Sequence, residues 1–119
     1  MQFKNEIDLF QYFINEYILS SSKILVIGLY KPQIKNILEF IDCQVFFIKE
    51  TMEYGIDITV ENYNDLPFED NSFDCIINFT NEYDLKVLSP NGKMLLKGEI
   101  LNGIEYYTFI NELSVYTVI

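Results

Sequence analysis

Acidic side chains are the groups in this sequence with the clearest capacity for chemistry. Asp65, Glu69, Asp70 and Asp74 crowd one stretch, and such a cluster can serve as a carboxylate pair or as a site for a hard cation. A calcium loop, however, places its ligands at alternating positions around a central glycine, and this stretch lacks that pattern. We therefore predict a solvated acidic turn, with no metal site and no catalytic residue.

Histidine is absent from the sequence. Acid–base chemistry would therefore fall to carboxylates, lysines or tyrosines, because histidine is the commonest general base and metal ligand. Most of the tyrosines lie in strand-like runs, where aromatic packing explains them. Cys43 and Cys75 are far apart in the sequence, and each lies beside or within an apolar run. We predict two buried thiols in a reducing compartment rather than a disulfide or a metal pair.

The composition is that of a single acidic domain. The chain has 119 residues, of which 50% are hydrophobic, so it can bury one core over residues 1–119. Eighteen acidic against eight basic residues give a net charge of −10, which repels phosphate backbones and predicts no nucleic-acid partner. No apolar run approaches the roughly 20 residues that cross a bilayer, so we expect no membrane partner and a cytoplasmic location.

The first half of the chain has the pattern of a helix followed by a βαβ unit. Residues 5–19 carry a helical apolar stripe, with Asn5 as a suitable N-cap. Residues 23–28 are an apolar strand ending in glycine, and Pro32 marks the start of a helix that runs to residue 42. A second strand follows at residues 44–48. This spacing predicts a parallel pair of strands with a right-handed crossover.

The second half has strand patterns separated by short connections. A polar turn at residues 66–72 leads directly into an apolar strand, and residues 81–88 have room for one or two helical turns. Ser-Pro-Asn-Gly at residues 89–92 has the composition of a turn. Strands are predicted at 56–60, 73–79 and 93–100, and in a closing antiparallel hairpin at 104–110 and 113–119 with turns at 102–103 and 111–112. The single domain thus comprises an N-terminal helix and linker (1–22), a βαβ-type core (23–101) and a C-terminal hairpin (102–119).

Two of these segments resemble motifs of the class I S-adenosylmethionine-dependent methyltransferases. Residues 66–77 are similar to that family's loop into its fourth strand, and residues 87–96 to its turn into the fifth. The order of elements from residue 23 onward is also similar, with residues 5–19 matching the preceding helix. The resemblance implies an α/β fold with a Rossmann-like, mostly parallel twisted sheet of about seven strands and a C-terminal antiparallel hairpin. The short connections imply a minimal form of that fold with one helical layer reduced.

The first motif of that family is degenerate in this sequence. The family has an acid and three closely spaced glycines after its first strand, because a backbone without side chains can approach the methionine end of the cofactor. Here Val26 stands in the acid's place and Gly28 is the one remaining glycine. Tyr30 and Pro32 stand at the other two glycine positions, so a phenol ring is expected where the family has open backbone.

S-adenosylmethionine is the cofactor that the resemblance implies, with no metal. The family's acid for the ribose hydroxyls is matched by Glu50, one position late, with Lys49 in register. The acid that reads the adenine amine aligns with Asn62, which can still accept a hydrogen bond. Residues 78–80 fall where amino-group methyltransferases carry an Asn/Asp-Pro-Pro-aromatic motif, but the prolines are missing and no catalytic role is carried over. The implied cofactor-binding residues are Gly28, Glu50, Asn62, Tyr63 and Phe79.

The short connections also bear on function. Strands with apolar residues on both faces need a cover on each face, and only the two predicted helices are available. We therefore expect a degenerate, non-catalytic methyltransferase-like domain that acts as a homodimer or as a partner subunit, with a protein covering one sheet face. The alternative is an S-adenosylmethionine-binding methyltransferase that acts on a small molecule or a protein. A third reading is one piece of a split enzyme.

Overall fold

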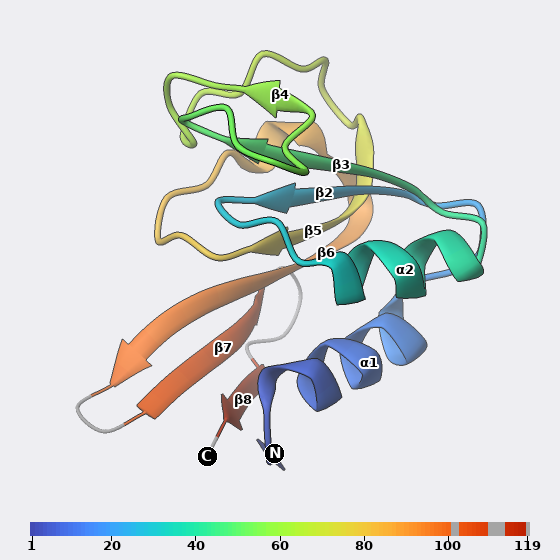
Figure 1. Cartoon of the computed structure of the whole chain (residues 1–119), viewed down its shortest axis with the longest axis vertical. Helices are drawn as coiled ribbons and strands as arrows, with labels where there is room; N and C mark the ends of the chain where they lie inside the picture. Colours follow the sequence, from blue (N-terminus) through green and yellow to red (C-terminus); the bar gives the residue numbers. More distant parts are fainter. Residues whose placement is uncertain (101–102, 110–113, 119) are drawn as a thin grey trace.

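A computed structural model describes residues 1–100, 103–109 and 114–118 of the chain (Figure 1). Helices and strands alternate in the first half, and strands dominate the second half. The elements in chain order are β1 (Gln2–Phe3), α1 (Glu6–Tyr17), β2 (Lys23–Ile27), α2 (Pro32–Phe40), β3 (Gln44–Lys49), β4 (Ile58–Thr59), β5 (Phe73–Asn78), the 3-10 turn η1 (Leu85–Val87), β6 (Leu88–Ile100), β7 (Gly103–Phe109) and β8 (Ser114–Val118).

One twisted sheet unites the strands in the order β1-β8-β7-β6-β5-β2-β3-β4. The strands from β4 to β6 pair in parallel, and β7 pairs antiparallel with both of its neighbours. The prediction of a mostly parallel sheet with a C-terminal antiparallel hairpin is confirmed. Figure 1 shows β2, β3 and β5 running in one direction, and the β6–β7 hairpin extending away from them.

The helices begin where the sequence predicts. Asn5 caps α1, because its side-chain oxygen accepts a hydrogen bond of 2.9 Å from the backbone N–H of Asp8. Pro32 occupies the first turn of α2, where its missing N–H costs nothing. Neither helix among the described residues is long and apolar enough to cross a membrane.

The sheet has one strand more than the seven predicted, and the additional strand is β1. Gln2 and Phe3 pair in parallel with Thr117 and Val118 of β8, so the first residues of the chain form an edge of the sheet. The backbone N–H of Thr117 also donates to the carbonyl of Met1 at 2.9 Å. Two residues are too few to produce a strand periodicity, so the sequence alone carries no signal for this pairing.

The predicted turn at residues 89–92 is wrong. These residues continue β6, and the extra length bulges out of the ladder, because Phe73 pairs with Leu88 whereas Cys75 already pairs with Lys93. Gly92 permits this close approach, since a Cβ atom there would lie 2.9 Å from the carbonyl oxygen of Asp74. The predicted turns at 102–103 and 111–112 fall outside the described residues, except for Gly103, where β7 begins.

One face of the sheet is covered by α1 and α2. Side chains from all three predicted parts of the chain meet in this core, which includes Phe10 of α1, Val26 of β2 and Tyr106 of β7. Figure 1 shows the two helices side by side on this face. The ring of Phe10 packs edge-on against Tyr106, with centroids 5.8 Å apart.

The expectation that the opposite face stays uncovered is wrong for the central strands. The connections before β5 and β6 place Val60, Tyr63 and Leu66 over it, together with Val87 of η1. Ile76 and Met94 are consequently buried by the chain's own residues. These covering residues are spaced irregularly, so they show no periodicity in the sequence. This part of the sheet is therefore buried within the chain itself.

Candidate functional site

The predicted cofactor-binding residues lie at one edge of the sheet. Strands β2 to β6 are parallel, so their carboxyl ends meet at the same edge, which is where open α/β sheets bind ligands. The predicted residues follow four of these strands: Gly28 after β2, Glu50 after β3, Asn62 and Tyr63 after β4, and Phe79 after β5.

Gly28 and Phe79 contact each other. The backbone N–H of Phe79 donates to the carbonyl of Ile27 at 3.0 Å, which brings the two loops together. A Cβ atom at Gly28 would lie 3.8 Å from that of Phe79 and only 2.7 Å from the methyl group of Thr80. Gly28 also has a φ of +94°, a conformation that side chains disfavour. The neighbouring loop therefore explains this glycine without any ligand.

Glu50 and Tyr63 form the second contact in the predicted set. The hydroxyl of Tyr63 accepts a hydrogen bond of 3.1 Å from the backbone N–H of Glu50. Tyr63 is buried, and this burial raises the pKa of its hydroxyl. Glu50 and Asn62 are exposed. Tyr63 thus contributes to the core beneath the edge, whereas the other two face solvent.

Tyr30 fills the edge between the loops that follow β2 and β3. Its ring packs edge-on against Phe47, with centroids 4.9 Å apart, and lies 5.8 Å from the ring of Tyr54. It also covers the backbone of Gly55, where a Cβ atom would lie 2.3 Å from the ring. The ring therefore packs between these two loops, and its coincidence with the family's open backbone stays a prediction. Gly55 was not predicted, although a glycine beside aromatic residues is a signal of close approach.

Hydrogen bonds fix the loop between β3 and β4, against which the ring of Tyr30 packs. Asp57 exchanges two bonds with Phe47, one from its backbone N–H to the Phe47 carbonyl and one from the Phe47 N–H to its carboxylate, both of 2.8 Å. Lys49 pairs with Glu53 at 2.9 Å. The packing around Tyr30 is thus part of an ordered structure.

A cavity of about 490 Å³ opens further along the same edge, beyond β5 and β6. Its walls are Phe79, Thr80, Asn81, Lys97, Gly98 and Glu99. Of the predicted cofactor-binding residues only Phe79 lines it. Lys97 and Glu99 were not predicted as site residues, although two charges at alternate positions of a strand place them on one face.

A network of paired charges lies beside this cavity. The carboxylate of Glu6 accepts a hydrogen bond of 2.5 Å from the hydroxyl of Tyr106 and pairs with Lys31 at 3.2 Å. Burial alone would raise the pKa of Glu6, but these two partners, with help from Lys97, lower it below its ordinary value. The ammonium group of Lys31 also lies 5.9 Å from the ring centroid of Phe79. The network joins α1 to the loops that follow β2 and β5.

The side-chain amide of Asn78 forms hydrogen bonds within the turn that follows β5. Its amide nitrogen donates to the carbonyl of Glu82 at 2.8 Å, and its oxygen accepts from both the backbone and the hydroxyl of Thr80 at 2.8 Å. The side chain is completely buried. Asn78 therefore organises the loop after β5.

The acidic stretch at residues 65–74 is used structurally. Asp65 pairs with Lys86 at 3.2 Å, and Asp74 accepts a hydrogen bond of 2.7 Å from the backbone N–H of Lys23. Within the described ranges, no three or more Asp, Glu or Cys side chains gather where they could hold a metal ion. Cys43 and Cys75 are buried free thiols, as predicted. Burial raises the pKa of both thiols.

Solved structures of similar fold include S-adenosylmethionine-dependent methyltransferases. One is a protein of Methanococcus maripaludis assigned to that class, with 15% identity and a TM-score of 0.59 over 77% of this chain and 54% of its own. The fold is that of the class I methyltransferases.

Two further structures support the class I methyltransferase-like fold. An Anabaena variabilis protein assigned as a methyltransferase of antibiotic biosynthesis has 17% identity and a TM-score of 0.54 over 76% of this chain and 44% of its own. Another is a Plasmodium falciparum protein assigned as a protein-L-isoaspartate O-methyltransferase and solved with S-adenosyl-L-homocysteine. It has 14% identity and a TM-score of 0.56, and the match covers 95% of this chain and 69% of its own. The chain thus spans about half the length of the first two, and the likeness shows the fold alone.

Comparisons of sequence give no further match. No family model matches the chain, and no curated protein does.

Proposed function

We propose that this chain is a methyltransferase-like domain that does not hold S-adenosylmethionine in the manner of the family, and that it works by binding another protein. The observation that carries the proposal is the ring of Tyr30, which lies on the backbone of Gly55 and against Phe47. The family keeps this part of the first motif open for the cofactor. The ring is partly buried against the core, so a ligand at this position would have to displace it.

The neighbouring residues fit the cofactor poorly as well. A Cβ atom at Gly28 would lie 2.7 Å from the methyl group of Thr80, so the open side of this glycine faces another loop. Lys49, which is in register with the family's ribose-binding acid, forms an ion pair with Glu53. Pro32 removes one of the backbone N–H donors that a glycine would offer. These residues favour an edge that is closed to the cofactor.

Calorimetric titration with S-adenosylmethionine and with S-adenosylhomocysteine tests the proposal. We expect no saturable heat at ligand concentrations up to about 1 mM, where even weak binding is measurable. Micromolar binding that is lost in Gly28→Trp, with the fold of the variant checked by circular dichroism, would contradict the proposal. The titration should be run on the full chain.

A second candidate function is an S-adenosylmethionine-binding methyltransferase, and the cavity of about 490 Å³ favours it. This cavity lies at the carboxyl edge beside Phe79, and one solved structure of similar fold carries S-adenosylhomocysteine. In this case the ligand would contact Lys97 and Glu99 rather than the loop at Gly28. Gly98→Trp would then abolish binding, whereas Gly28→Trp would matter less. The pair of variants separates the two candidates.

A further inference from the structure

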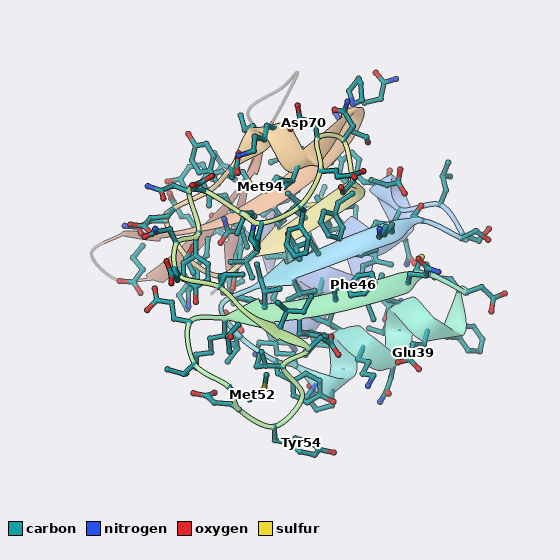
Figure 2. All side chains as sticks on the ribbon, turned by 90° about the horizontal axis from the view of Figure 1, so that it is seen from above. Glu39, Phe46, Met52, Tyr54, Asp70 and Met94 are labelled. Atoms are coloured by element: carbon teal, nitrogen blue, oxygen red, sulfur yellow. The ribbon has the colours of Figure 1, made fainter. Side chains whose placement is uncertain are left out.

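Residues 50–58, which comprise the loop between β3 and β4 and the first residue of β4, display apolar side chains to solvent. Tyr54 is 91% exposed, Met52 63% and Ile58 37%. Figure 2 shows Tyr54 pointing away from the rest of the molecule, with Met52 on the same loop. Clustered exposed apolar groups on a domain surface mark interaction sites more often than scattered ones do.

The exposure is maintained by an ordered loop. Asp57 is tied to Phe47 by two hydrogen bonds, and the N–H of Ile56 donates to the carbonyl of Glu53 at 3.1 Å. The backbone of Gly55 packs against the ring of Tyr30. These bonds hold the backbone so that Met52 and Tyr54 face outward instead of folding into the core. A rigid platform lowers the entropy cost of binding.

The surroundings of these apolar groups are acidic. Glu50, Asp57 and Glu61 are exposed, and Lys49 at the end of β3 is already paired with Glu53. A partner that covers Met52 and Tyr54 must therefore bring positive charge to the rim. A second copy of the chain would bring a net charge of −10 and the same carboxylates, which disfavours self-association through this loop.

We propose that residues 50–58 are a docking site for a basic amphipathic segment of another protein. This inference rests on the proposed function, because it names the surface through which the domain binds its partner. Tyr54 and Met52 supply the apolar contact, for which tyrosine and methionine are well suited, since both bury a large area and methionine adapts its shape. The carboxylates of Glu50, Asp57 and Glu61 face the basic side chains of the partner and give the contact its charge selectivity.

Binding of a synthetic peptide tests the site. The probe is an amphipathic peptide of leucine and lysine, about 15 residues long so that it can form a helix. We expect saturable binding that weakens at least about tenfold in the double variant Met52→Ser/Tyr54→Ser, which corresponds to about 1.4 kcal/mol. The same peptide with glutamate in place of every lysine should not bind, and added salt should weaken the interaction.

Phe40→Ser is the matched control. Phe40 is also an exposed aromatic residue, 89% accessible. It ends α2 just before β3 begins, whereas Met52 and Tyr54 follow the end of β3. Figure 2 places its neighbour Glu39 well away from Met52 and Tyr54. The control variant should bind the peptide as tightly as the natural chain. Equal loss in the control, or no loss in the double variant, would overturn the proposal.

Three other outcomes also decide the matter. Equal binding of the glutamate peptide would remove the charge selectivity, and absence of any peptide binding would remove the site. Self-association of the natural chain in sedimentation experiments, abolished by the double variant, would make a second copy the occupant. None of these depends on S-adenosylmethionine. Calorimetry with that ligand on the same sample therefore shows separately whether the proposed function has failed.

Discussion

Beyond β2 and β3 the carboxyl edge of the sheet is filled by the ring of Tyr30, whereas beyond β5 and β6 it opens into a cavity of about 490 Å³. Both halves are built on parallel strands, with the bulge at residues 89–92 interrupting the β5–β6 pairing. The difference arises from the loops after β2 and β3 in one half and from the last residues of β6 in the other. A phenol ring at position 30 meets a glycine at position 55 in one half, and charged residues 97 and 99 face open space in the other.

The sheet has the same parallel topology on both sides of this contrast. The buried strands depend on their apolar side chains and on backbone pairing. Loops vary more readily than strands, although here some loop residues, such as Val60 and Leu66, also belong to the core. Fold likeness to methyltransferases is therefore compatible with either an open or a closed edge, and the two halves can be altered separately.

The largest effect is expected for Gly55→Ala. The φ of +87° at this position and the contact with Tyr30 both penalise a Cβ atom, so the free energy of unfolding should fall by about 3 kcal/mol. Gly98→Ala in the open half is the matched control, because its Cβ would meet the outer edge of the half-buried Tyr107 ring, which can shift. That variant should lose about 1 kcal/mol. Urea unfolding measures both, and equal losses would contradict the contrast between the halves.

A smaller loss is expected for Tyr30→Ala. The ring is only partly buried, so its removal should cost about 2 kcal/mol, less than the truncation of a fully buried aromatic side chain. Tyr54→Ala removes an almost fully exposed ring beside it and should change the free energy of unfolding by less than about 0.5 kcal/mol. The comparison is made by urea unfolding at neutral pH. If the two variants were equally stable, Tyr30 would not be packed as described.

The charge network beside the open half should contribute least and depend on pH. The folded pKa of Glu6 lies below its ordinary value of 4.5, so its stabilising effect is complete above that value and is lost as the pH falls below it. Glu6→Gln should therefore cost about 1 kcal/mol at pH 7 and progressively less in acid. Urea unfolding at several pH values measures this. The exposed Glu16→Gln on the same helix is the control, and a pH-independent loss in Glu6→Gln would contradict the assignment.

The sequence predicts the central strands and helices because their signals are local. The apolar run at β2, Pro32 at the start of α2 and the cap at Asn5 each determine structure through neighbouring residues alone. Residues 89–92 show the opposite case. Ser-Pro-Asn-Gly has the composition of a turn, but pairing with β5 keeps it in β6 as a bulge.

The candidate site is predicted only in part for the same reason. A ring at Tyr30 beside the first motif is what the resemblance implies, whereas the contact of Gly28 with Phe79 is not predicted. Gly55 is not foreseen, because its role depends on a ring that lies 25 positions earlier in the chain. The cover over Ile76 is missed as well, since it comes from irregularly spaced loop residues.

The central claim is that the edge closed by Tyr30 does not hold S-adenosylmethionine, and amide spectra of the ¹⁵N-labelled chain test it most directly. S-adenosylhomocysteine would be added to about 1 mM, well above the dissociation constants expected for specific binding. The account predicts no saturable shifts at Gly28, Glu50 or Tyr63. Saturable shifts that cluster at these residues would contradict it.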